Sequence, residues 1–305
     1  MNESCYNINL ITLLRLEGLG LIKLSKLTKY LYEDYKLVDL QNLIFNHLAK
    51  KYSIQELESA NSHAYKIVEV CNENSISILT ESKLPTLLDN LKNPPVILYC
   101  LGNPPIDSDD YTTVIGTRKP SYEAINATKI ISTQLIERND VIISGLALGV
   151  DIVAHNQAVK HKKPTIAILG SGVLKPYPPQ NIKTAKEIVE NQGCLLSEYE
   201  PTANMQNYML VARDRIQAGI SKKLVLIQSK LDGGSMHATK TMIGLGRPVY
   251  YVNYEGVTDV DVSGNVSLIN TENCIPINYS ELLKNLDCFT TTYLPSKNQQ
   301  DSFNF

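Results

Sequence analysis

Short apolar runs rich in β-branched residues alternate with longer amphipathic segments between residues 112 and 252. The apolar runs predict strands at 112–116, 141–145, 165–170, 194–197, 223–228 and 248–252. The segments between them predict helices at 122–137, 151–161, 181–192 and 235–246. Strands that are apolar on both faces are typical of a sheet covered by helices on both sides. The pattern therefore predicts an α/β fold with a mostly parallel, doubly wound sheet.

The first 70 residues have a different, helical periodicity. Apolar side chains recur every three or four positions from Ile8, and the pattern resumes after Gly18 and Gly20. This helix–glycine–helix corner resembles a helix-hairpin-helix or sterile-alpha-motif element, whose turn can offer backbone N–H groups to a phosphate. A plain helical corner with glycine at the C-cap explains the same pattern. We expect a small helical domain over residues 1–70.

Residues 71–106 connect this helical domain to the predicted sheet. Prolines at positions 94, 95, 104 and 105 bracket one apolar run, Val96–Leu101, and predict a strand at the rim of the sheet. Beyond residue 252 the segment 263–277 predicts a strand or a short helix, and 279–286 predicts a closing helix. We expect the second domain to span residues 71–290, followed by a disordered polar tail at 291–305.

Composition narrows the class of protein. The 305 residues are 43% hydrophobic and carry a net charge of −2, which excludes a globally basic nucleic-acid-binding protein. Residues 111–250, however, contain 17 Lys and Arg against 10 Asp and Glu, so a local basic face is expected. The six cysteines form no CxxC pair, and no apolar run of about 18 residues occurs. These features predict a cytoplasmic protein with no metal site and no membrane partner.

Glycine-rich turns follow four of the predicted strands. Backbone N–H groups and helix N-termini converge at such turns, and glycine lets a phosphate approach closely. The turns supply the candidate residues Gly116, Thr117, Gly145, Gly170, Gly172, Gly234 and Ser235. Some of these glycines could serve only the tight turns. Because neither GxGxxG nor GxxxxGK[ST] occurs, no dinucleotide or ATP cofactor is expected.

Basic side chains accompany these turns, whereas catalytic candidates are few. The basic residues beside the turns or at strand ends are Arg118, Lys119, Lys175, Arg213, Arg215 and Lys240. A polyanion laid along this edge would bind in a salt-dependent way. Asp151 and His155 share a helix face and could form an acid–base pair, although Asp151 could equally cap that helix. Glu198 follows a strand without an evident catalytic partner, so we expect binding rather than turnover.

Several long motifs occur together in one order: VIGTRKPS, SGLALGVDIVAH, TIAILGSGVLKPYPPQN, LLSEYEP, RDRIQAGISKKLVLIQ and GGSMHATKTMIGLGRPVYYV. In these segments, which cover roughly 113–252, the chain resembles the DNA-processing protein A (DprA/Smf) family. The resemblance implies an extended Rossmann fold that binds single-stranded DNA without catalytic turnover. It further implies a homodimer that protects incoming strands during natural transformation and loads the RecA recombinase in recombination.

The resemblance also assigns roles to residues. Arg118 corresponds to a phosphate-contacting arginine, Gly116 and Thr117 to the backbone of that pocket, and Lys175 to a flanking basic position. Arg213 and Arg215 correspond to an arginine motif that faces the same groove, and Tyr177 is a candidate for base stacking or for the core. Two departures, Asp214 in place of asparagine and Leu148 in place of arginine, imply weaker DNA binding.

Two other functions remain open from the sequence. The wider superfamily includes nucleotide-binding sensors and phosphoribohydrolases, but the stretch LDGGSMHATK lacks the leading proline, third glycine and glutamate of that enzyme pattern. A paralogue serving a defence or phage-related pathway would also retain DNA binding. The residues do not distinguish that role from transformation.

Overall fold

The computed structural model describes residues 3–19, 21–28, 30–31, 35–256, 260–284 and 286–289. Within these residues, nine strands form one sheet in the order β1-β2-β6-β5-β4-β3-β7-β8-β9. The strands are β1 (Ile76–Leu79), β2 (Leu98–Gly102), β3 (Tyr111–Ile115), β4 (Val141–Ser144), β5 (Thr165–Ile168), β6 (Cys194–Ser197), β7 (Lys223–Leu226), β8 (Val249–Asn253) and β9 (Cys274–Asn278). The tail at 291–305 and Gly20 lie outside the described residues.

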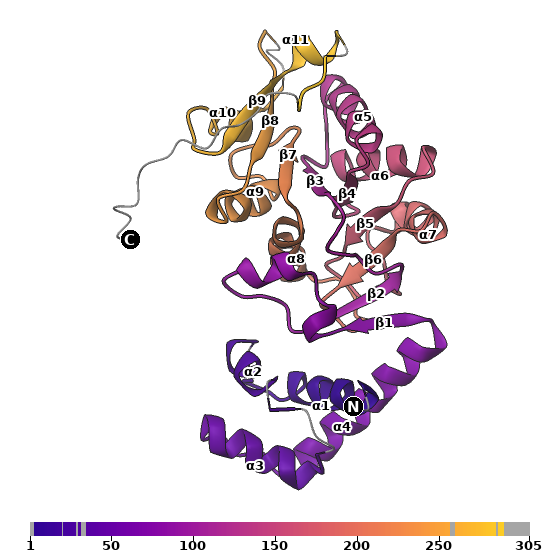
Figure 1. The fold of residues 1–305 in the computed structure, drawn as a ribbon, viewed down its shortest axis with the longest axis vertical. Coiled ribbons are helices and arrows are strands. Elements are labelled where there is room, and N and C mark those ends of the chain that lie inside the picture. The colour runs from indigo at the N-terminus through magenta and orange to yellow at the C-terminus, as the bar shows by residue number, and fades with distance from the viewer. Residues whose placement is uncertain are drawn as a thin grey trace.

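The sheet is parallel from β6 through β9, whereas β2 is antiparallel to both of its neighbours, β1 and β6. Helices α5 (Tyr122–Glu137), α6 (Val150–Lys160) and α7 (Ile182–Glu190) cover one face. Helices α8 (Asn207–Ile220) and α9 (Ser235–Gly244) cover the other (Figure 1). The predicted doubly wound α/β fold is confirmed, and the strands β3 to β8 coincide with the six apolar runs.

Burial explains why these segments form a two-sided sheet. Strands β3 to β6 are buried along their whole length. Ala127, Ile131 and Leu135 on one face of α5 pack against that sheet together with Ala154 of α6. Burying apolar surface on both faces is the dominant stabilising contribution in such a fold.

The expected rim position of the strand at Val96–Leu101 is wrong. This segment forms β2, which lies between β1 and β6 in the sheet. Strand β1 pairs outside it, with Ile76 opposite Leu101 and Leu79 opposite Leu98. The prolines are accommodated because they lie before and after the paired residues rather than within them.

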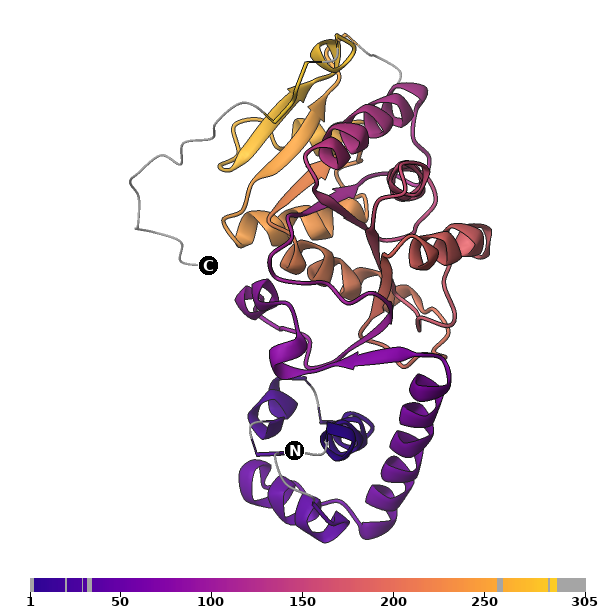
Figure 2. The same cartoon turned by 45° about the vertical axis from the view of Figure 1, so that its right-hand side comes forward.

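Four helices precede the sheet: α1 (Glu3–Leu14), α2 (Leu21–Thr28), α3 (Leu37–Leu48) and α4 (Ile54–Glu73). Helix α4 begins with a capping box, because Ser53 Oγ accepts from the Glu56 N–H while Glu56 accepts from the Ser53 N–H. It passes residue 70 and leads directly into β1 (Figure 2). Leu10 and Leu13 share one continuous core with Tyr99 and Leu195 of the sheet, so the helical layer is packed onto it.

The remaining described elements are short helices. The 3-10 helices are η1 (Glu81–Lys83), η2 (Thr86–Asn90) and η3 (Pro179–Asn181), and the last helices are α10 (Ser263–Val266) and α11 (Tyr279–Leu282). Arg247 ties the end of α8 to η2, because its guanidinium donates to the carbonyls of Ala218, Gly219 and Leu87. These bonds satisfy carbonyls that the end of a helix leaves unpaired. In the described part of the chain, no helix has the length and apolarity needed to cross a membrane.

Candidate nucleic-acid interface

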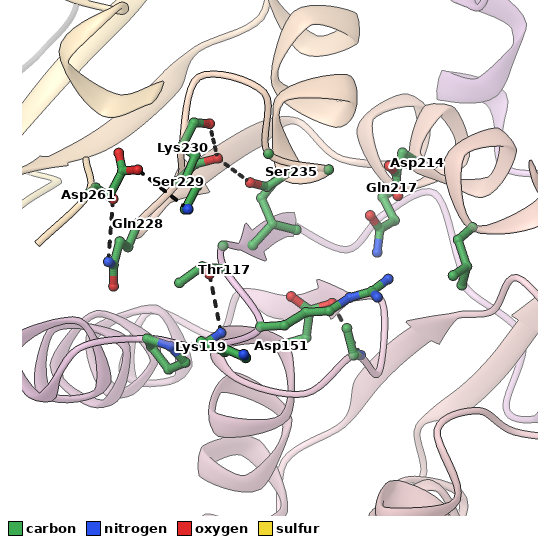
Figure 3. A pocket seen from close by; sticks show the side chains of 18 of the residues that line it. Thr117, Lys119, Asp151, Asp214, Gln217, Gln228, Ser229, Lys230, Ser235 and Asp261 are labelled. Atoms are coloured by element: carbon green, nitrogen blue, oxygen red, sulfur yellow. Dashed lines mark hydrogen bonds and ion pairs between the residues drawn. The ribbon is translucent and has the colours of Figure 1, made fainter. Parts of the chain in front are cut away.

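A cavity of about 770 Å³ lies at the carboxyl ends of β3 and β7. Strand β3 continues through α5 to β4 on one side, while β7 lies on its other side, so this is where the strand order reverses. Ligands of open α/β sheets bind at such switch points. The walls come from the turn after β3, the turn after β7 and the inner face of α8 (Figure 3).

The Gly116-Thr117-Arg118 turn forms one lip of this cavity. The Thr117 N–H donates to the carbonyl of Gln228 at 2.7 Å, which fixes the turn to the end of β7. A side chain at Gly116 would lie 2.6 Å from Val150 Cγ2 and 3.0 Å from the Gln228 carbonyl, so the position has no room for one. The backbone beside Arg118 is therefore held rigidly between β7 and α6.

Arg118 and Lys119 extend from this lip into solvent. Within the described ranges, no acidic side chain pairs with either of them and no hydrogen-bond acceptor holds the Arg118 guanidinium. Across the cavity, Lys230 is also exposed and lies 3.7 Å from Asp261. The mouth therefore carries three cations and one partly paired carboxylate, an arrangement that attracts an anion.

Three helices begin around the same mouth. Helix α5 begins after Ser121, whose Oγ accepts from the Ala124 N–H at 3.1 Å. Helix α6 begins at Val150, whose N–H donates to the Thr117 carbonyl at 3.2 Å, and α9 begins at Ser235. Helix N-termini carry partial positive charge, so their convergence favours a negatively charged group at this mouth.

The candidate residues divide between this mouth and other places. Gly116, Thr117, Arg118, Arg213, Gly234 and Ser235 line the cavity. Gly145 lies just beneath it, where its N–H donates to Asp151. Gly170 packs against Leu210, and Gly172 packs against the carbonyls of residues 200 and 201. Lys175, Lys240 and Tyr177 are exposed outside the cavity wall, so a DNA contact by them stays a prediction.

Arg213 forms the floor of the cavity and is 6% exposed. Its Nη1 donates to the carbonyls of Gly145, at 2.7 Å, and of Ile168, while its Nε donates to Asp214 at 2.9 Å. The guanidinium thus joins the ends of β4 and β5 to α8. These three hydrogen bonds are directed into the protein, so Arg213 supports the crevice from below.

Two carboxylates surround this arginine. Burial raises the pKa of Asp214 to about 6, and the neighbouring Arg213 opposes that shift. Burial likewise raises the pKa of Asp151, opposed by Arg213 and by the N–H groups of Ala147 and Gly145. The guanidinium therefore favours the ionised form of both acids, against the effect of burial.

The structure corrects the expectation that Arg213 and Arg215 face one groove. Residues two apart on a helix point about 200° apart, and Arg215 faces a different cavity on the other side of α8. There its Nη2 donates to both carboxylate oxygens of Glu198 at 2.7 Å. Glu198, which had no evident partner in the sequence, is thus paired.

The structure gives the possible acid–base pair two structural roles. Asp151 accepts from the N–H groups of Gly145 and Ala147, at 3.1 and 3.3 Å, and so caps the loop after β4. His155 is fully buried, with Nδ1 2.9 Å from Thr165 Oγ1, and burial lowers its pKa to about 3. Its ring therefore stays neutral near pH 7.

Two residues directly after β7, Gln228 and Lys230, were not among the candidates from the sequence. Gln228 accepts from the Ser121 N–H at 2.9 Å, which positions the start of α5, and Lys230 supplies a cation opposite Arg118. Their only sequence signal is their place directly after an apolar run. Within the described residues, no cluster of three or more His, Cys, Asp or Glu side chains is arranged to hold a metal ion.

The fold and this mouth define the chain as a doubly wound α/β protein with a crevice at its switch point whose mouth carries exposed cations. Residues 75–287 match the family model of DNA recombination-mediator protein A. The chain belongs to this family, which is the DprA/Smf family indicated by the sequence motifs.

Named relatives support this assignment. The chain is 31% identical over 190 residues to Protein Smf of Borreliella burgdorferi, covering 62% of this chain and 59% of that protein. It is 32% identical over 179 residues to the DNA processing protein DprA of Streptococcus pneumoniae, covering 58% and 62% respectively. The chain thus spans about three fifths of the length of these curated relatives.

Two solved structures are similar to this one. The X-ray structure of DNA processing protein A from Streptococcus pneumoniae shares the fold, with a TM-score of 0.74 at 22% identity, covering 91% of this chain and 97% of that one. The structure of DNA processing protein A from Helicobacter pylori, reported for its single-stranded DNA binding mode, has a TM-score of 0.60 at 28% identity. It covers 68% of this chain and 94% of that one.

Proposed function

We propose that this protein binds single-stranded DNA, with the phosphates of the strand lying across the crevice at the switch point. The observation that carries the proposal is the pair of exposed cations, Arg118 and Lys119, above three converging helix N-termini. Guanidinium groups and backbone N–H groups hold phosphates without reading sequence. The similarity to the Helicobacter protein, reported for its single-stranded DNA binding mode, supports the same ligand here.

The cellular role that we propose follows the family. The protein acts in the cytoplasm as a homodimer, protects incoming single strands during transformation and delivers them to RecA recombinase. Membership in a recombination-mediator family supports this role. Size-exclusion chromatography with light scattering tests the dimer, and a pull-down with purified RecA tests the partner; absence of RecA from the pull-down would favour a defence-related pathway.

Arg118→Ala is expected to weaken binding of a poly-thymidine oligomer and to reduce its dependence on salt. Removing one phosphate contact to a single strand should lower the slope of log K against log salt by about 0.7. Fluorescence anisotropy at several salt concentrations measures both quantities. The loss should be similar for every oligomer sequence, because phosphate contacts carry no sequence information.

Lys160→Ala is the matched control for this experiment. Lys160 is exposed in the last turn of α6, at the end of that helix remote from the crevice. Its removal should leave affinity and salt slope close to those of the unaltered protein. If Arg118→Ala behaves like Lys160→Ala, the crevice is not the phosphate site.

We further propose that the crevice binds without turnover. The acids beneath it, Asp151 and Asp214, are held by backbone N–H groups and by Arg213. Incubation with nucleoside monophosphates should therefore release no free base above the background of protein-free samples, as followed by chromatography. Release that rises with protein concentration would instead indicate phosphoribohydrolase activity.

A further inference from the structure

A second cavity, of about 840 Å³, lies on the opposite side of α8 from the crevice. Its walls come from the end of α1, the residues after β6 and the outer face of α8. Glu198, Tyr199 and Glu200 directly follow β6, so this cavity opens at the same edge of the parallel sheet as the crevice. The two cavities are separated by one helix, whose diameter is about 10–12 Å.

The interior of this second cavity combines apolar walls with one polar pair. Ile11, Leu14 and Met209 contribute apolar surface. Arg215 reaches into it and is fixed by Glu198, and its Nη1 is buried without a hydrogen-bond partner among the described residues. Burial also raises the pKa of Glu198, although Arg215 opposes the shift. An apolar pocket with a few convergent polar groups is the usual form of a small-ligand site.

Aromatic and cationic side chains complete the lining of the second cavity. Tyr208, on the first turn of α8, is 61% exposed, and Tyr199 is half-buried nearby. In the part of the chain that the structure describes, no other aromatic ring stacks on either tyrosine. Arg15 is held by Glu200 at 3.0 Å, whereas Lys23 is exposed and has no acidic partner within the described ranges. Exposed rings beside cations match a planar base that carries a phosphate.

The geometry points to a nucleobase site in this second cavity, filled by a base of the same single strand whose phosphates lie in the crevice. The base stacks on Tyr208, and its polar edge faces Arg215 and Glu198. This inference rests on the proposed function, because the strand must first be held at the crevice. Helix α8 then lies under the strand between the two cavities, with Leu210 and Arg213 lining the crevice on one side and Tyr208 and Arg215 lining the base site on the other.

The chemistry that recognises a base in a strand also suits a free nucleotide, so the experiment must separate the two sources. The probe is a poly-thymidine oligomer of about 20 nucleotides carrying 5-iododeoxyuridine, which crosslinks to adjacent aromatic side chains on irradiation. Mass spectrometry locates the crosslink, and anisotropy gives the affinity. The variants are Tyr208→Ala, Tyr208→Phe and Tyr65→Ala, the last being an exposed tyrosine on α4 that lines neither cavity.

Crosslinks are expected at Tyr208 or Tyr199. Loss of one base–aromatic stack lowers affinity by about tenfold, so Tyr208→Ala should bind the oligomer roughly that much more weakly. Tyr208→Phe keeps the ring and Tyr65→Ala leaves the cavity intact, so both should bind like the unaltered protein. Because Tyr208 is exposed, its removal should not alter folding, which circular dichroism checks.

Two results would overturn the inference while leaving the proposed function intact. One is oligomer binding that depends on Arg118 but not on Tyr208, with crosslinks only at the crevice. The other is binding of thymidine monophosphate that depends on Tyr208 when oligomer binding does not, which would assign the cavity to a free nucleotide. Failure of the unaltered protein to bind any oligomer would instead overturn the proposed function. The inferred base site would then fail as well, because it requires a bound strand.

Discussion

Arg213→Met is expected to destabilise the fold by about 3–5 kcal/mol, the cost of removing one partner from a buried ion pair. Methionine keeps much of the side-chain volume but no charge. The carboxylates of Asp214 and Asp151 would remain buried without their guanidinium, and the carbonyls of Gly145 and Ile168 would lose a donor. Urea denaturation followed by circular dichroism measures the loss.

The double variant with Arg213→Met and Asp214→Asn shows whether the unpaired carboxylate causes this loss of stability. Removing the stranded carboxylate should restore part of the lost stability, because the uncompensated charge is the main penalty. The same variants test whether Arg213 contacts DNA. A single variant that keeps its stability but loses affinity and salt dependence would show that this guanidinium holds a phosphate directly, contrary to its inward hydrogen bonds.

Gly149→Ala should cost about 3 kcal/mol and also weaken DNA binding. Gly149 precedes α6 with φ +83° and ψ −125°, a conformation that residues with a side chain rarely adopt and that costs them about 1–3 kcal/mol. A side chain there would overlap the carbonyl oxygen of Thr117 and lie 2.8 Å from Arg118 Cα, and overpacking adds about 1–3 kcal/mol. Relief of that overlap would move the turn that presents Arg118. Urea denaturation measures stability, and anisotropy measures affinity.

Gly234→Ala is the matched control, because it changes a glycine of the same crevice. At Gly234 a side chain would meet no atom within 4 Å, and φ is −55°. Its effect on stability should stay within about 0.5 kcal/mol, the usual range for an open surface position. Equal losses for both variants would mean that the Gly149 backbone is not the constraint we describe.

The parallel part of the fold could be predicted because its residues follow one simple rule. Each strand from β3 to β8 coincides with a short, mainly apolar run, and α5 has the bounds predicted for it, Tyr122–Glu137. Helix α8 was not predicted from the sequence. Its inward face includes Arg213, Asp214 and Gln217, which are polar although they are buried. A pattern that scores only apolar residues cannot detect such a face.

The candidate site was predictable at its backbone but not in the direction of its side chains. Gly116, Thr117 and Arg118 could be placed because a turn after a parallel strand must lie at the carboxyl edge. Whether an arginine points outward or inward depends on partners that are distant in sequence. Arg213 bonds residues 68 and 45 positions away, and Arg215 pairs with Glu198. No local spacing encodes those contacts.

Helix α8 is the common wall of the crevice and of the second cavity. Ala212 and Arg213 are consecutive yet face different cavities, since successive helical side chains point about 100° apart. An insertion or deletion of one residue within α8 would therefore turn the following side chains by about 100° and displace both linings together. A change in the length of this helix therefore alters the two cavities at once, whereas a single substitution can alter either one alone.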